Sequence, residues 1–115
     1  MSHVTAGWVL AKVDALTPNP YTEAEKRHWL LQAECFAAQT IGSSPPEGPL
    51  EDGQTLLAPV PYDGLYLRYI EAQIHYAGGE MTRYNNAITA WNELLLTWRD
   101  ACQRRDDRAK ALKLC

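Results

Sequence analysis

A seven-residue apolar repeat between residues 81 and 102 constrains the fold of this chain more than any other feature. Its members recur at alternating three- and four-residue spacings: Met81, Tyr84, Ile88, Trp91, Leu95, Trp98 and Cys102. This spacing places a continuous stripe along one face of an α-helix and is typical of a helix packed lengthwise against another. We therefore predict a long helix over residues 80–105, about 38 Å in length at 1.5 Å per residue.

Residues 63–77 are predicted to form the partner of this helix. One face carries Leu65, Tyr69, Ala72 and Tyr76. Gly78-Gly79 then breaks the helix and can supply the left-handed conformation that a helix C-terminus often needs. The two helices make a hairpin, but the partner reaches only about 23 Å. Because it cannot cover the long helix, we expect other subunits to bury the far end.

The N-terminal part is predicted to add two more helices. Residues 4–16 carry Val9 and Val13 at helical spacing, and the proline-rich turn at 17–20 ends that helix. The next helix begins with a capping box in which Thr22 and Glu25 satisfy each other's free amides, and it continues to residue 41. The fold class is therefore all-α: a small bundle of about four helices with a long C-terminal hairpin.

Residues 42–61 show no periodicity and hold five of the seven prolines, so we expect a long Pro/Gly-rich loop. Loops of this length in compact domains are usually functional. The apolar centre at 56–61 would lie across the helices in a monomer or on a neighbouring copy in an oligomer, and we favour the neighbour.

The length of 115 residues allows one domain with a hydrophobic core of its own. We assign residues 1–102, including loop 42–61, to the helical domain and residues 103–115 to a charged tail. Residues 1–100 hold six basic and twelve acidic side chains, a charge of −6, whereas residues 101–115 hold five basic and two acidic, a charge of +3. Such an acidic body is not expected to wrap DNA by neutralising phosphates.

Catalytic, metal-binding and cofactor-binding patterns are missing, so we predict that the protein is not an enzyme and needs no cofactor. The three histidines stand in separate segments: His3, His28 and His75. The cysteines are odd in number and have no C-x-x-C spacing, which favours a reduced, intracellular protein: Cys35, Cys102 and Cys115. No apolar run approaches the roughly 20 residues that span a bilayer, and we expect a soluble protein made in the cytoplasm, with no membrane partner.

Two segments resemble the tailed-phage head–tail connector (adaptor, or head-completion) family. The first, VLAKVDALTPNPYTEAEKRHWLLQAE, matches its helix–turn–helix opening at Asp14, Leu16, Pro18, Asn19, Tyr21, Trp29 and Leu30. The second is similar to the family's helical hairpin at Pro61, Tyr62, Asp63, Leu65, Tyr66, Tyr69, Gly79, Glu80, Arg83, Tyr84, Asn85 and Asn86. Together the segments cover more than half of the chain in the family's order. Loop 42–61 and the residues after Glu34 depart from the pattern.

The resemblance implies a structural virion protein at the neck, made in the host bacterial cytoplasm. Its partners would be neighbouring copies in a ring, typically of twelve, together with the portal protein, a stopper or tail-completion protein, and double-stranded DNA passing non-specifically through the bore. In such rings the C-terminal segment commonly docks on the portal. The docking residues expected here are Arg104, Arg105, Arg108, Lys110, Lys113 and Leu114.

Other interpretations remain open at this point. The hairpin residues Arg83, Tyr84, Asn85 and Asn86 either brace the tip around Gly78-Gly79 or recognise a partner. For the whole chain, the alternative is a non-viral small helical adaptor or regulator that binds one protein partner. A DNA-binding regulator ranks third, since the only basic cluster is the tail, and an enzyme ranks last.

Overall fold

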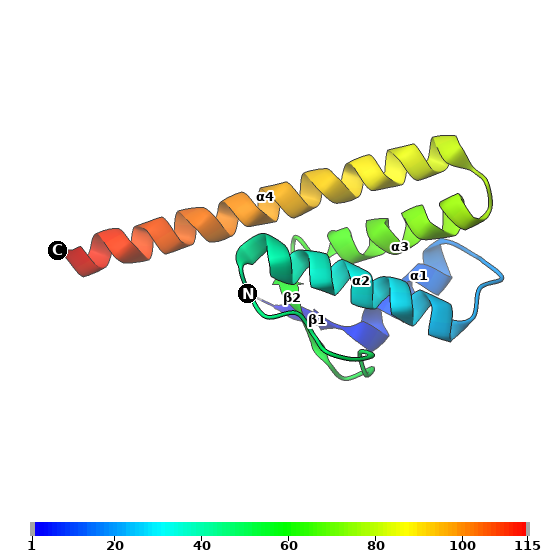
Figure 1. The fold of residues 1–115 in the computed structure, drawn as a ribbon, viewed down its shortest axis with the longest axis horizontal. Helices are drawn as coiled ribbons and strands as arrows, with labels where there is room; N and C mark the ends of the chain where they lie inside the picture. Colours follow the sequence, from blue (N-terminus) through cyan, green and yellow to red (C-terminus); the bar gives the residue numbers. More distant parts are fainter. Residues whose placement is uncertain (1, 115) are drawn as a thin grey trace.

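The computed structural model describes residues 2–114, and the side chains up to Leu112. It consists of four helices and one two-stranded antiparallel sheet (Figure 1). In chain order, the elements are β1 (His3–Thr5), α1 (Ala6–Leu16), α2 (Glu23–Ile41), β2 (Thr55–Pro59), α3 (Gly64–Ala77) and α4 (Met81–Leu114). The fold is therefore mainly helical, as the apolar periodicity predicts.

The hairpin of α3 and α4 dominates the shape of the molecule. Figure 1 shows the two helices running antiparallel, with α1, α2 and the sheet gathered on the α3 side and the C-terminal part of α4 extending past all of them. The molecule consequently measures 56 Å along its longest axis but only 30 and 22 Å across. At 1.5 Å per residue α4 is about 51 Å long and α3 about 21 Å. The difference in length between the two helices is therefore larger than the sequence predicts.

The hydrophobic core lies between α1, α2, α3, β2 and the middle of α4. Its largest fully buried side chains are Tyr66, Leu30, Leu50, Leu56, Leu65, Ile70 and Val9. Along α4, Leu95 and Trp98 are buried in this core, whereas Ile88 and Trp91 are half-buried at its edge. The first member of the seven-residue repeat, Met81, is exposed. From Tyr84 to about Cys102 the repeat marks the face that packs on the body, which we call the seam.

Local signals set the helix ends. The capping box of α2 is confirmed: the Glu25 amide donates to Thr22 Oγ1 and the Thr22 amide donates to Glu25 Oε2, both at 3.1 Å. Gly79 takes the left-handed conformation with φ +74°, as the Gly78-Gly79 break predicts. The expected start of the first helix is too early, because residues 3–5 form β1 and the Thr5 side chain caps α1 by accepting from the Trp8 amide at 3.2 Å.

The expectation of an irregular loop over residues 42–61 is wrong at its C-terminal end. Residues 55–59 form β2, which pairs with β1 in a register that joins His3 to Pro59. The His3 ring also contacts the Leu56 carbonyl through Nδ1 at 3.0 Å. Leu56 and Ala58 are almost fully buried in their own chain. The expectation that this segment lies on a neighbouring copy is therefore wrong for these two residues. A strand was hard to foresee because its pairing partner lies 50 residues away.

The remaining part of the loop is held against α1 and α2. Arg27 donates to the Leu50 carbonyl at 2.6 Å and to Asp52 Oδ1 at 2.6 Å. Asp52 in turn approaches α1 at Gly7, whose amide donates to the Asp52 carbonyl at 2.9 Å; a Cβ at Gly7 would stand only 3.0 Å from that of Asp52. A second ion pair, Lys26 to Asp14 at 2.6 Å, joins α2 to α1.

Candidate functional site

The C-terminal part of α4 is the most unusual feature of the structure, and we call residues 103–114 the arm. Whereas the helix was expected to end near residue 105, it continues to Leu114. Every side chain from Gln103 to Leu112 is exposed, and the arm points away from the body (Figure 1). A helix whose side chains are exposed over three turns is suited to contact with another molecule.

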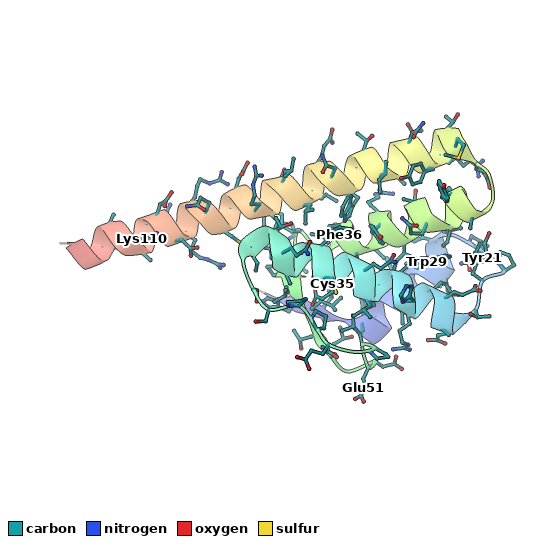
Figure 2. The ribbon with its side chains drawn as sticks, in the orientation of Figure 1. Tyr21, Trp29, Cys35, Phe36, Glu51 and Lys110 are labelled. Atoms are coloured by element: carbon teal, nitrogen blue, oxygen red, sulfur yellow. The ribbon has the colours of Figure 1, made fainter. Side chains whose placement is uncertain are left out.

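The expected docking residues are all on this arm. Arg104, Arg105, Arg108 and Lys110 are exposed, and Figure 2 shows the labelled Lys110 side chain on the arm, far from the body. The side chains of Lys113 and Leu114 lie outside the described part of the structure. Five basic residues against two acidic ones give residues 103–114 a formal charge of +3.

The arm leaves the body beside a small hollow of about 70 Å³. It is lined by Pro59, Tyr62, Trp98, Ala101, Cys102 and Arg105. Arg105 Nη2 contacts Cys102 Sγ at 3.9 Å, and burial raises the pKa of the Cys102 thiol. The thiol therefore stays protonated and packs as a small apolar group at the root of the arm.

The hairpin residues of the family motif are separated into two places. Tyr62 and Asp63 precede α3 beside the root of the arm, whereas Arg83, Tyr84, Asn85 and Asn86 belong to the first turns of α4, at the tip of the hairpin. Asp63 takes the N-cap position of α3 but its side chain makes no capping hydrogen bond. The motif is thus two local features of one hairpin and not a single site.

At the tip, two contacts hold the turn together. Arg83 forms an ion pair with Glu80 at 3.1 Å, and the Tyr84 ring packs edge-on against Tyr76 with centroids 5.2 Å apart. Asn85 and Asn86 are exposed, and within the described residues neither side chain makes a hydrogen bond. Bracing of the tip therefore accounts for the first two of these residues and leaves the asparagines free for a partner.

A polar hollow of about 440 Å³ lies beside the tip. Its lining is Leu16, Thr17, Pro18, Glu71, Ile74, His75, Glu80, Arg83 and Asn86. His75 Nε2 stands 3.9 Å from Glu71 Oε1, and its Nδ1 is buried with no partner among the described residues. Glu71 and Glu80 are already paired with Arg68 and Arg83, so the hollow has no net charge that selects a ligand class.

Sequence reasoning missed an apolar groove along the outer face of α2. It consists of two adjoining hollows of about 410 and 290 Å³ that share His28 and Leu31. The complete lining is Ala24, Arg27, His28, Leu31, Gln32, Cys35, Phe36, Gln39, Pro49 and Tyr69. Figure 2 shows Cys35 and Phe36 along this helix, and Phe36 is 42% exposed. We call this feature the α2 groove.

The floor of the α2 groove is an aromatic cluster. Phe36 packs against Tyr69 and Trp91 at centroid distances of 5.9 and 5.5 Å, and Tyr69 packs against Trp91 at 5.2 Å. The Tyr69 hydroxyl donates to Gln32 Oε1 at 2.9 Å. Rigid aromatic side chains of this kind offer a large contact area at a low cost in conformational entropy. Leu31 and Cys35, one helical turn apart, could have signalled an apolar stripe, but the contributions of Tyr69 from α3 and Pro49 from the loop could not be seen.

A buried polar cluster behind the groove joins α2, β2 and α3. Glu34 Oε1 accepts from the Tyr66 hydroxyl at 2.6 Å, and Glu34 Oε2 accepts from the Leu57 amide at 3.0 Å. The Tyr66 oxygen also accepts from the Ala58 amide at 2.9 Å. Burial raises the pKa of Glu34 and of Tyr66. Because this cluster is sealed from solvent, it stabilises the fold and does not contact a ligand.

Two physical tests bear on the kind of site. Among the described residues, no group of three or more His, Cys, Asp or Glu side chains is placed to hold a metal ion. None of the described helices is apolar enough over a sufficient length to cross a bilayer. The exposed features that remain are the arm and the α2 groove.

Comparison of the chain with protein-family models, with curated proteins and with solved structures gives no match.

Proposed function

We propose that this chain is an adaptor subunit of a tailed-phage head–tail connector, the ring in the neck that joins the portal to the tail. One observation carries the proposal: α4 extends past its own body as an arm whose side chains from Gln103 to Leu112 are all exposed. An exposed helical arm of this kind is expected in a subunit that is completed by assembly with other subunits.

In this proposal, copies of the chain form a ring beneath the portal, with a stopper or tail-completion protein on the other side. Residues 1–100 carry a charge of −6, so a bore lined by these bodies would mildly repel DNA phosphates and let the duplex slide. The basic arm supplies a contact that joins the subunit to the rest of the neck. The role is structural, and no catalytic step is assigned.

The α2 groove supports a second candidate, a non-viral helical adaptor that binds one protein partner. Its apolar, aromatic lining resembles the receptor surface of helix-in-groove recognition. This candidate predicts a monomer or dimer with a single partner, whereas the connector proposal predicts a ring or a chain that assembles on the portal.

Native mass spectrometry of the purified chain, alone and with the portal protein of the same source, tests the proposal. We expect a cyclic oligomer, or a monomer that forms a ring when the portal is added. A chain that remains monomeric or dimeric and does not bind the portal would contradict the connector role and favour the single-partner adaptor.

A further inference from the structure

We propose that the α2 groove is the receptor for the arm of a neighbouring copy of this chain. The inference deepens the proposed function, because it names the contact that would link subunits around the ring. Four observations support it. The arm cannot reach the groove of its own chain, the arm and the groove have similar lengths, their charges are opposite, and the arm has apolar side chains on one face.

The arm cannot occupy the groove of its own chain. α4 is a single helix from Met81 to Leu114, and Figure 1 shows its C-terminal part leading away from α2. A bend large enough to return the arm would break the helix. Contact between an arm and a groove therefore requires two molecules and is heterologous, the type of contact that generates a closed ring or an open filament.

The dimensions of the two surfaces agree. The groove extends along α2 from Ala24 to Gln39, about 22 Å at the helical rise, and the arm from Gln103 to Leu114 is about 17 Å long. A helix of this length can thus lie within the groove without overhanging it. Recognition would use the helix-in-groove mode, with apolar anchors one helical turn apart.

The charges of the two surfaces are complementary. Two carboxylates lie beside Arg27, a residue of the groove lining: Glu23 at 3.0 Å and Asp52 at 2.6 Å. Two carboxylates against the one guanidinium of Arg27 leave −1, whereas the arm carries +3. Both carboxylate side chains remain largely exposed although they pair with Arg27. Opposite charges of this kind orient and accelerate association.

The arm presents an apolar face of its own. The spacing of the seam continues past Cys102 through Arg105, Ala109 and Leu112. Leu112 is 71% exposed, and the aliphatic part of an arginine can pack on apolar surface while its head stays in water. Ala109 and Leu112 would therefore face the groove floor at Phe36, with the basic side chains directed toward the two carboxylates at the edge of the groove.

A disulfide trap tests the contact, because the groove already contains a free thiol, Cys35, about one helical turn from the midpoint of the groove along α2. The arm's central residue is Ala109, so Ala109→Cys places a second thiol within about one helical turn of Cys35 whichever way the arm runs. The other two cysteines are removed by Cys102→Ser and Cys115→Ser. We expect mild oxidation to produce intermolecular disulfides that appear as a ladder of multimers on non-reducing gels.

The matched control is Asp107→Cys in the same background. Two residues correspond to about 200° around a helix, so this thiol faces away from the groove. We expect it to cross-link at least about tenfold more slowly, as the geometric limits on disulfide formation require. Equal rates for the two variants, with circular dichroism showing both folded, would overturn the proposal. A ladder that stops at the dimer would also overturn the ring-forming contact, since it would indicate reciprocal exchange of arms.

Exchanging the charges of the arm and the groove tests the same contact independently, with the rate of cross-linking as the measurement. The double change Arg104→Glu and Arg108→Glu should slow cross-linking at least about tenfold, because like charges would face each other. Adding Glu23→Lys and Asp52→Lys, the two carboxylates beside Arg27, should restore it. If the fourfold variant stays slow while remaining folded, the charges do not meet and the proposal fails.

The failure of this contact can be told apart from failure of the connector role. Binding of the portal by the Ala109→Cys variant, without any disulfide between Cys35 and the introduced thiol, would leave the connector role in place and assign the arm to the portal. Cross-linking without portal binding would retain the contact between copies and remove the connector role.

Discussion

The seam and the arm are two parts of one helix that carry the same apolar spacing but have opposite surroundings. In the seam, Leu95 and Trp98 are buried against the body. In the arm, the same spacing reaches Ala109 and Leu112, which are exposed. The apolar spacing therefore shows which face of a helix can be buried, but it does not show which other surface buries it.

The helical structure of the two parts is also stabilised by different interactions. The seam is stabilised by burial of its apolar face. The arm continues a helix that is already nucleated, and each added residue forms a hydrogen bond without a new nucleation cost. Its Arg, Lys, Ala, Leu and Gln residues all have high helix propensity. Helical structure in the arm is therefore expected even without a partner.

Truncating a tryptophan of the seam should give the largest loss of stability. Trp98 is 3% exposed, so Trp98→Ala should lower the free energy of unfolding by about 3–5 kcal/mol. Trp91 is half-buried against Phe36 and Tyr69, and Trp91→Ala should fall near the lower end of that range. Urea unfolding followed by circular dichroism measures both. Leu112→Ala in the arm is the control, and its free energy of unfolding should hardly change. If Trp98→Ala lowers the free energy of unfolding by less than about 1 kcal/mol, the seam is not part of the core.

Removing the buried carboxylate should have the next largest effect. Glu34→Ala leaves the Leu57 amide and the Tyr66 hydroxyl without their acceptor, which should cost about 1–3 kcal/mol. Glu34→Gln keeps an acceptor and should cost less. The side chains of residues 103–112 in the arm are exposed, so a charge-removing change there, such as Asp107→Asn, should be nearly neutral in the same assay.

The Glu34 carboxyl should also make stability depend on pH. Burial raises its pKa in the folded protein above the ordinary value of 4.5, so the folded state binds the proton more tightly than the unfolded state does. Its stabilising contribution is complete below pH 4.5 and is lost as the pH rises through the raised pKa. The difference in unfolding free energy between wild type and Glu34→Gln should therefore change across that window and be constant below it. A difference that is independent of pH would show that Glu34 ionises in the fold as it does in water.

A glycine exchange at the tip should have a smaller effect. Gly79 has a φ of +74° and no neighbouring atom within 4 Å of an added Cβ, so Gly79→Ala should cost about 1 kcal/mol from backbone strain alone. Gly78 has a φ of −85°, and Gly78→Ala is the matched control with little or no loss. Equal losses at the two positions would mean that the turn does not require the left-handed conformation.

Deleting residues 103–115 should change the stability least. Because the side chains of residues 103–112 are exposed, we expect the free energy of unfolding to change by less than about 0.5 kcal/mol. Assembly with partners, measured by pull-down and native mass spectrometry, should nevertheless be lost. A deletion that begins at Trp98 serves as the contrast and should unfold the body. If the shorter protein still assembles fully, the arm has no docking role.

Interactions between residues close in the chain were predicted correctly from the sequence. The capping box at Thr22 and Glu25, the break at Gly79 and the hairpin that joins residues 63–77 to the long helix depend on contacts within a few residues or on apolar periodicity. The basic character of the arm was also evident from the sequence, whereas the docking role of its residues stays a prediction. Pairing of β1 with β2 was missed because it joins residues 3–5 to residues 55–59. The α2 groove was missed because Tyr69 of α3 and Pro49 of the loop contribute to it beside α2.

By itself, the amino-acid sequence determined where helices form, which face of each is apolar, and that a basic segment follows an acidic body, since these properties depend on residue type and spacing alone. Only the tertiary structure decided that Leu56 and Ala58 are covered by their own chain, that Phe36 is half-exposed beside Tyr69 and that the arm is not covered. The physical reason is that burial depends on which distant surfaces meet, and a one-dimensional pattern does not contain that information.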